Sequence, residues 1–245
     1  MIRTGVVLPT FRDSPDAALE VARAAFAAGV DGVFCYDHIW PIGQPERPAL
    51  APFPVLAAVA AEMADRPTGA DGGGPYVGTL VARVGLAPNP VLVRQFSTLH
   101  HLAPGRVIAG LGTGDRLSEA ENVAYGIPFD PPEERWAQLT ELASALGQLA
   151  MPVWIAGGPA GRTDEARATG AALNVWDAPP ALVTERTQGP GGVEVTWAGP
   201  PPPSVRAMTQ TVRSVAAAGA SWAVFGWPVD LPALAASSNG SRSGS

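Results

Sequence analysis

Strand-like apolar runs alternate with helix-like segments along almost the whole chain. Strands are expected at residues 5–10, 32–36, 76–84, 107–111, 153–156, 172–176, 193–197 and 222–225. Helices are expected at residues 16–28, 55–64, 91–102, 118–123, 132–149 and 163–169. Such alternation predicts parallel strands that are joined by crossover helices. The eight strand-like segments favour a closed (β/α)8 TIM barrel, and an open doubly wound sheet is the alternative.

The composition bounds the kind of protein that this chain can form. Of its 245 residues, 47% are hydrophobic and 16% are charged, which is typical of a globular chain with a full core. We expect one domain over residues 1–236 and a disordered tail over the Ser- and Gly-rich residues 237–245. The net charge of −6 argues against a nucleic-acid partner, and no apolar run reaches membrane-spanning length. Because the N-terminus enters a strand rather than a signal peptide, we expect a cytoplasmic protein.

The side chains that the sequence contains, and those that it lacks, exclude particular kinds of chemistry. All 16 basic residues are arginine, which excludes a lysine Schiff base and a lysine clamp on a substrate phosphate. The single cysteine, Cys35, lies in an apolar strand and is expected to be buried and inert. No cluster of His, Cys, Asp and Glu has the spacing of metal ligands, and no Ser or Cys lies in a nucleophile elbow.

Residues 103–115 read as a helix end, a buried strand and a glycine-rich turn that ends in a carboxylate. Gly105 closes the preceding helix. Gly110, Gly112 and Gly114 allow a sharp turn and a close approach of backbone N–H groups to a ligand. Asp115 then lies at the C-terminal end of a strand, where α/β barrels place their chemistry. An ordinary tight turn is the alternative interpretation of the same glycines.

The corner Asp37-His38-Ile39-Trp40 follows the second expected strand. Histidine moves protons near neutral pH, and a neighbouring carboxylate can orient it. Trp40 can stack on a planar ring or form a pocket wall. The alternative is that Asp37 caps a turn, His38 is a surface group and Trp40 only packs. His100 and His101 lie near a helix end, where a structural role is expected.

These segments together resemble the luciferase-like monooxygenase superfamily. The resemblance runs in order from about residue 4 to residue 176 and returns weakly at residues 219–227. It is carried by Asp37-His38, Gly78-Thr79, Asn89-Pro90, residues 102–107, Gly112-Thr113-Gly114-Asp115 and residues 152–158. The resemblance implies a (β/α)8 barrel whose C-terminal mouth binds either reduced flavin mononucleotide (FMN) or the deazaflavin coenzyme F420. It is strongest for the F420-dependent oxidoreductase branch, which transfers hydride between the coenzyme and a small organic substrate.

The F420 branch also implies which residues form the site. It assigns catalytic roles beside the deazaflavin ring to His38, Trp40 and Asp115. It places a non-prolyl cis peptide at Leu80-Val81 behind the ring. The backbone of residues 157–161, at a helix N-terminus, suits the cofactor phosphate. The expected cofactor-binding residues are Asp37, Gly78, Thr79, Leu80, Val81, Gly112, Thr113, Gly114, Ser118, Ala156, Gly157, Gly158, Pro159, Ala160 and Gly161.

Departures from the family pattern leave alternatives open. The F420 branch often has Glu where this chain has the shorter Asp115. Sugar-phosphate dehydrogenases of the branch hold the phosphate with lysines, so glucose 6-phosphate is not the expected substrate here. The alternatives are an FMNH2-dependent monooxygenase that uses O2 and a non-catalytic flavin-binding barrel. Helices 55–64 and 91–102 are apolar over more than one face, and we expect a homodimer through this region, as the family implies.

Overall fold

The computed structural model describes residues 2–63, 75–157 and 162–239. Its strands are β1 (Arg3–Val7), β2 (Gly32–Cys35), β3 (Tyr76–Thr79), β4 (Ala82–Arg83), β5 (Val107–Gly112), β6 (Val153–Gly157), β7 (Ala172–Trp176), β8 (Val195–Gly199) and β9 (Trp222–Phe225). Its helices are α1 (Asp16–Ala28), α2 (Pro52–Glu62), α3 (Asn89–Leu102), α4 (Arg116–Ala124), α5 (Pro132–Gly147), α6 (Thr163–Thr169), α7 (Pro180–Gln188), α8 (Val205–Ala217) and α9 (Leu231–Asn239).

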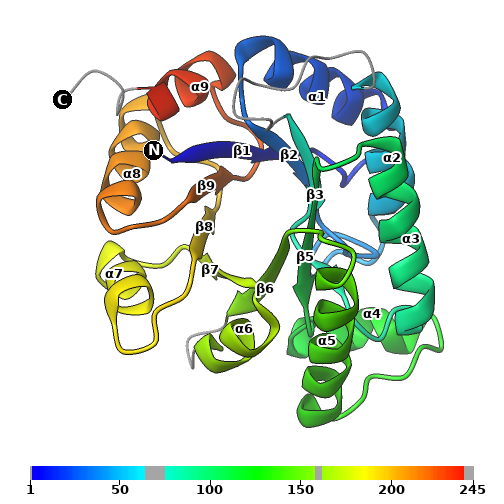
Figure 1. Cartoon of the computed structure of the whole chain (residues 1–245). Coiled ribbons are helices and arrows are strands. Elements are labelled where there is room, and N and C mark those ends of the chain that lie inside the picture. Colours follow the sequence, from blue (N-terminus) through cyan, green and yellow to red (C-terminus); the bar gives the residue numbers. More distant parts are fainter. Residues whose placement is uncertain (1, 64–74, 158–161, 240–245) are drawn as a thin grey trace.

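The strands form a closed parallel barrel with the helices on its outside (Figure 1). The neighbours around the ring are β1, β2, β3, β5, β6, β7, β8 and β9, and β9 pairs with β1 again. The short strand β4 pairs with β5 beside the end of β3. Because β3 pairs with β5, the sheet is closed, which excludes the open doubly wound alternative. The expected (β/α)8 barrel is confirmed.

Local sequence signals determine the bounds of several elements. The helices α1 and α6 and the strands β7 and β9 have the bounds that the sequence predicts. In α1, the buried residues Ala18, Val21, Ala22 and Ala25 recur at helical spacing and face the sheet. Gly29 ends this helix with a φ of 87°, in the left-handed region that glycine enters without steric cost.

Other helices and strands begin or end at residues that differ from those that the sequence predicts. The sequence predicts the first strand at residues 5–10, but β1 runs over Arg3–Val7 because Arg3 pairs with Trp222 in the closed ring. The helix α2 begins at Pro52 rather than at residue 55, since proline suits the first turn of a helix. The expected long third strand is two strands, β3 and β4, which are separated at Leu80-Val81.

The C-terminal region departs from the expected tail. The helix α9 includes Ser237 and Ser238, which the sequence assigns to the disordered tail. The Ser237 hydroxyl donates to the Ala233 carbonyl at 2.8 Å, and Ser238 is buried. A serine hydroxyl satisfied by the preceding helical turn allows the helix to continue through a serine pair. Residues 240–245 of the expected tail lie outside the described residues.

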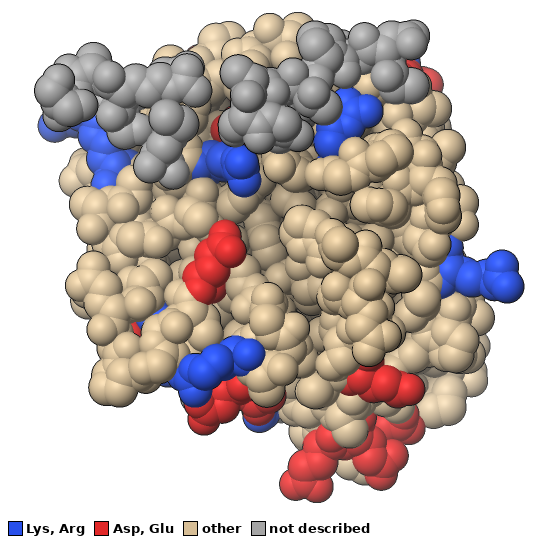
Figure 2. All heavy atoms as spheres, viewed as in Figure 1, with Lys and Arg blue, Asp and Glu red and all other residues tan. Residues whose placement is uncertain are grey.

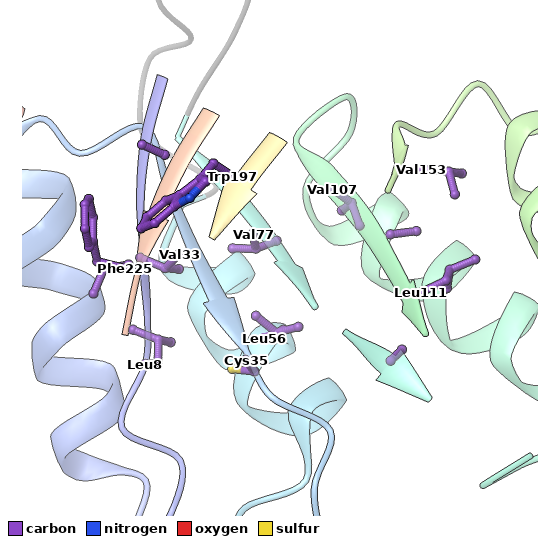
Figure 3. Packing of buried hydrophobic residues seen from close by; sticks show 14 of the residues in the cluster. Leu8, Val33, Cys35, Leu56, Val77, Val107, Leu111, Val153, Trp197 and Phe225 are labelled. Carbon is purple, nitrogen blue, oxygen red and sulfur yellow. The ribbon is translucent and has the colours of Figure 1, made fainter. Parts of the chain in front are cut away.

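The larger hydrophobic cluster lies between the barrel and its helices (Figure 3). Side chains such as Val33 and Val77 point outward from the strands and contact helix residues such as Leu56. Cys35 belongs to this cluster and is buried, as the sequence predicts. Burial raises the pKa of its thiol far above the ordinary value, so the thiol stays protonated and unreactive at neutral pH.

Aromatic rings fill the interior of the barrel. The Phe34 ring stacks on Trp154 with centroids 5.1 Å apart and meets Trp222 edge-on at 5.8 Å. Glycine on the neighbouring strand leaves the room for this packing. A Cβ atom on Gly78 would lie 2.6 Å from the Ile108 carbonyl oxygen and 3.0 Å from the Phe34 ring. The described interior of the barrel is therefore a packed core rather than a channel.

Charged side chains are spread unevenly over the face that Figure 2 shows. Figure 2 shows scattered Arg side chains on one face and a group of acidic side chains over α5. The first turn of this helix contains Glu133 and Glu134, where acidic side chains oppose the positive end of the helix dipole. Within the described part of the chain, no helix has both the length and the apolar character required to cross a membrane.

Candidate active site at the carboxyl end of the barrel

A cavity of about 400 Å³ lies at the carboxyl ends of the strands. Its lining comes from the segments that follow β1, β2, β3 and β5 and from the end of β7. The lining residues are Phe11, Tyr36, Asp37, His38, Ile42, Leu80, Val81, Arg83, Gly114, Ser118 and Trp176. Six of them, Asp37, His38, Leu80, Val81, Gly114 and Ser118, belong to the site that the sequence predicts.

His38 is held by a buried carboxylate from a distant helix. Its Nδ1 atom lies 2.7 Å from Oε1 of Glu121 on α4, and the Glu121 side chain is only 1% exposed. Within the described residues, this contact is the only hydrogen bond of the His38 ring. The other ring nitrogen, Nε2, makes no hydrogen bond within the described residues, and His38 is one of the residues that line the cavity. Glu121 is not among the site residues that the sequence predicts.

Arg83 connects the His38–Glu121 pair to Asp37. Its Nη2 atom donates to Oε2 of Glu121 at 3.0 Å, and its backbone N–H donates to Oδ2 of Asp37 at 2.9 Å. Burial raises the pKa of Asp37 above its ordinary value, against the opposing effects of the Arg83 N–H and the Arg83 charge. Asp37 therefore joins the start of the corner to the backbone of β4, while Arg83 balances the charge of Glu121.

Aromatic side chains form the apolar part of the cavity wall. The Phe11 ring stacks on Tyr36 with centroids 5.8 Å apart, and Tyr36 meets Trp176 at 6.3 Å. Trp176 is half exposed at the end of β7. Burial raises the pKa of Tyr36 to about 12, so its phenol is protonated at neutral pH. None of the three aromatic residues, Phe11, Tyr36 and Trp176, is among the site residues that the sequence predicts.

The bulge between β3 and β4 contributes two further wall residues. The Leu80-Val81 peptide bond is cis, as the resemblance implies, and both side chains line the cavity. Gly112 leaves room for Val81, because a Cβ atom there would lie 2.5 Å from Val81 Cγ2. The Thr79 hydroxyl donates to the Gly110 carbonyl at 2.7 Å across the strands. Thr79 is thus a barrel-wall residue whose side chain is already satisfied.

Asp115 caps the helix that follows the glycine-rich turn. Its Oδ1 atom accepts from the backbone N–H groups of Leu117 at 2.8 Å and Ser118 at 3.1 Å. The Ser118 hydroxyl in turn accepts from the Asp115 backbone N–H at 3.2 Å, which completes a capping box. Asp115 is exposed and does not line the cavity, whereas Ser118 is buried and does. The carbonyls of Thr113 and Gly114 accept from Nη1 of Arg135.

Trp40 lies behind the cavity wall rather than in it. Its ring is buried and lies 6.1 Å from the Tyr125 ring at the end of α4. It therefore packs the corner against the same helix that supplies Glu121. Trp40 is not among the described residues that line the cavity.

The expected phosphate-binding turn is only partly described. Ala156 and Gly157 end β6 and are partly exposed at the carboxyl end of the barrel. Gly158, Pro159, Ala160 and Gly161 lie outside the described residues. Arg162, at the start of α6, stacks over the Trp136 ring at 4.0 Å and pairs with Glu165 at 2.7 Å. Its charge is therefore already engaged.

The chain is similar in sequence to several known proteins. No family model matches the chain. It is 33% identical over 151 residues to an F420-dependent glucose-6-phosphate dehydrogenase of Intrasporangium calvum, which covers 61% of this chain and 42% of the relative. A protein of the same name from Kineococcus radiotolerans is 34% identical over 137 residues, covering 56% of this chain and 37% of the relative. The matched region thus spans about two fifths of the length of these curated relatives.

Solved structures share the fold over nearly the whole chain. An F420-dependent secondary alcohol dehydrogenase in complex with an F420–acetone adduct superposes with a TM-score of 0.72 at 13% identity, covering 97% of each chain. An F420-dependent tetrahydromethanopterin reductase of Methanopyrus kandleri gives a TM-score of 0.66 at 12% identity, covering 96% of this chain and 97% of the other. The monooxygenase RslO1 of Streptomyces bottropensis gives 0.63 at 14% identity, covering 96% of each chain.

The fold is the (β/α)8 barrel that these solved structures share. Over the matched region, the sequence relatives confirm the predicted resemblance to F420-dependent enzymes.

Proposed function

We propose that the chain is an F420-dependent oxidoreductase that transfers hydride between the deazaflavin and a small organic substrate. The observation that carries the proposal is the cavity wall at His38, where Nδ1 is bound to a buried carboxylate and Nε2 is left for a ligand. An imidazole held in this way can accept or release a proton at one defined nitrogen. The sequence relatives named as F420-dependent dehydrogenases support the choice of coenzyme.

The residues that line the cavity fit a flat aromatic ring. The volume of about 400 Å³ lies in the range of about 300–1,000 Å³ that is usual for ligand pockets. Leu80 and Val81 offer a flat apolar surface at the bulge, and Tyr36 and Trp176 offer aromatic faces. When bound, F420 supplies the hydride-accepting or hydride-donating carbon, C5 of its ring. The cofactor phosphate is assigned, as a proposal from the sequence, to Ala156, Gly157 and residues 158–161.

The chain supplies orientation and proton transfer. His38 Nε2 takes or gives the proton that accompanies hydride transfer at the substrate. The aromatic wall excludes water from the reacting atoms, which strengthens electrostatic interactions in the site. The catalytic roles that the resemblance implies for Trp40 and Asp115 stay predictions. Trp40 packs behind the wall, and the Asp115 carboxylate already serves as a helix cap.

The substrate proposed here carries no phosphate group. Arg83 is the one Arg that lines the cavity in the described part of the chain. Its charge is paired with that of Glu121 through Nη2, although its Nε makes no hydrogen bond to a described residue. The sequence also contains no lysine. A free phosphate would need at least one uncommitted cation in the cavity to replace its hydration. We therefore propose a neutral organic substrate rather than a sugar phosphate.

Cofactor binding is the direct test. Purified protein is titrated separately with F420 and with FMN, and the absorbance and fluorescence of the bound chromophore are recorded. We expect saturable binding of F420 and much weaker binding of FMN. Binding of FMN alone would favour a flavin-dependent monooxygenase, for which the RslO1 barrel is a structural precedent. Binding of neither would contradict an enzyme of this branch and favour a non-catalytic barrel.

A homodimer is proposed through the groove between α2 and α3. The groove has a volume of about 510 Å³, and apolar side chains such as Phe53, Ala57, Val91 and Leu102 line it. Val91 and Leu102 are 45% and 41% exposed. Exposed apolar side chains around an apolar groove are typical of a protein interface. A second copy of this chain is the proposed occupant.

A further inference from the structure

Glu121 makes contacts that set it apart from the other acidic residue of its helix. Glu119 is exposed, whereas the Glu121 side chain is 1% exposed and directed at the corner after β2. Its Oε1 atom lies 2.7 Å from Nδ1 of His38. Its Oε2 atom accepts from the Ile39 backbone N–H at 2.8 Å and from Arg83 Nη2 at 3.0 Å. Both oxygens of the carboxylate are therefore engaged.

The two donors on Oε2 determine what Oε1 can do. An N–H group of the backbone and an arginine can only donate, so Glu121 must accept from both. Burial by itself would raise the pKa of Glu121. The hydrogen bonds from His38 and Ile39 and the charges of His38 and Arg83 outweigh burial and lower that pKa below its ordinary value. Glu121 is consequently ionised at neutral pH and offers Oε1 only as an acceptor.

We infer that Glu121 is a positioning residue that fixes neutral His38 as its Nδ1–H tautomer and leaves the Nε2 lone pair to the cavity. This inference rests on the proposed proton-transfer role of His38. An acceptor at 2.7 Å from Nδ1 requires the proton to be on Nδ1 in the neutral and in the charged ring. The tautomer in turn decides whether the cavity meets a proton acceptor or a proton donor.

The other charged groups near His38 are Asp37 and Arg83. Asp37 accepts the backbone N–H of Arg83 rather than a ring nitrogen of His38. The Arg83 guanidinium lies on the far oxygen of Glu121 and also reaches the Ser118 carbonyl at 3.4 Å. Arg83 thus holds the carboxylate in place, and Glu121 is the group that contacts the ring.

Nitrogen NMR of the protein without cofactor tests the inference. The sequence has three histidines, so protein labelled with ¹⁵N-histidine gives a short spectrum, and a His38→Asn variant assigns the His38 signals. In the neutral His38 ring, we expect a protonated Nδ1 and an unprotonated Nε2. A wild-type spectrum with the proton on Nε2 would overturn the inference without any other variant. This readout needs neither F420 nor a substrate, so it can fail independently of the proposed function.

Two matched variants separate positioning from general stability. In Glu121→Gln, whose amide can donate as well as accept, we expect the ratio of Nδ1–H to Nε2–H tautomers to fall by about 10-fold or more. Glu119→Gln removes the same charge from an exposed position on the same helix and should leave the ratio unchanged. Circular dichroism establishes that each variant is folded before it is compared. A folded Glu121→Gln protein with the wild-type ratio would show that Glu121 is only a structural residue.

Discussion

The Nδ1 atom of His38 lies 2.7 Å from Oε1 of Glu121, although 83 residues separate them in the sequence. The contact joins the corner after β2 to the helix after β5, two segments that the closed barrel places side by side at its carboxyl end. The tertiary fold thereby completes a site whose histidine is visible in the sequence and whose carboxylate is not.

Replacing His38 by alanine tests the proton-transfer role. We expect His38→Ala to lower the rate of F420 turnover by about two orders of magnitude or more, the usual effect of losing an acid–base group. The dissociation constant for F420, measured by fluorescence titration, should change far less, because backbone and apolar contacts supply most of the binding. A variant that keeps full turnover while losing F420 would show that His38 is a binding residue.

The other two histidines provide the control for this experiment. His101 Nδ1 lies 2.7 Å from the Ser97 carbonyl in its own helix, and His100 is part of the same helix end. We expect His100→Ala and His101→Ala to retain turnover and to change only the unfolding free energy.

Substitution of Asp115 separates a helix cap from a catalytic acid. Asp115→Ala removes the capping box and should lower the unfolding free energy by about 1 kcal/mol. Asp115→Asn keeps an oxygen that can cap α4 but removes the charge, so its stability in urea denaturation should be close to that of the wild type. If Asp115→Asn is fully stable yet loses turnover, the catalytic role that the resemblance implies is supported. If it keeps turnover, Asp115 is a cap.

Acid titration of stability tests the charge of Glu121. A carboxylate whose pKa is lowered in the folded state stabilises the protein above its unfolded pKa, and this stabilisation is lost as the pH falls through the folded pKa. The stability difference between the wild type and Glu121→Gln should therefore be largest near neutral pH. It should begin to shrink below about pH 5 and continue to fall below about pH 4, since the ordinary pKa of Glu is about 4.3. Asp37, whose pKa is raised, acts in the opposite sense, and Glu121→Gln also removes the Glu121 charge that helps to raise the pKa of Asp37. A difference that stays constant with pH would contradict an ionised Glu121.

Substitution of Gly112 by alanine tests whether Val81 forms part of the cofactor site. A Cβ atom in Gly112→Ala would lie 2.5 Å from Val81 Cγ2, so Val81 must move toward the cavity that it lines. Overpacking of this kind costs about 1–3 kcal/mol, and we expect the dissociation constant for F420 to rise by about 10-fold. Gly147→Ala at the end of α5 meets its nearest atom at 3.9 Å and should bind F420 like the wild type. Unchanged binding in folded Gly112→Ala would place the ring elsewhere.

Sedimentation velocity at micromolar concentration tests the homodimer. The wild type should sediment as a dimer, and Val91→Glu should shift it toward the monomer because a charge would be buried in the α2–α3 groove. Val205→Glu on α8 is the matched control, since both valines are 45% exposed. A wild-type monomer would contradict the proposed interface.

The sequence by itself determined the barrel and most of its elements. Apolar periodicity, prolines at helix starts and glycines such as Gly29 are local signals, and α1 and α6 therefore have the bounds that they predict. Residue type and position after a strand were also sufficient to propose His38, because the carboxyl ends of parallel strands meet at one end of a barrel.

Only the tertiary structure decided which groups these residues meet. Glu121 resembles any charge of a solvated helix in the sequence, and no local pattern distinguishes it from Glu119. Asp115, by contrast, follows a glycine-rich strand end and invites a catalytic interpretation, yet its carboxylate is satisfied by two N–H groups of its own helix. Local structure depends on interactions between residues that are near in the sequence. The partner of a buried polar group depends on which distant segments the closed barrel brings into contact. A polar group that is buried by this contact needs a hydrogen-bond partner.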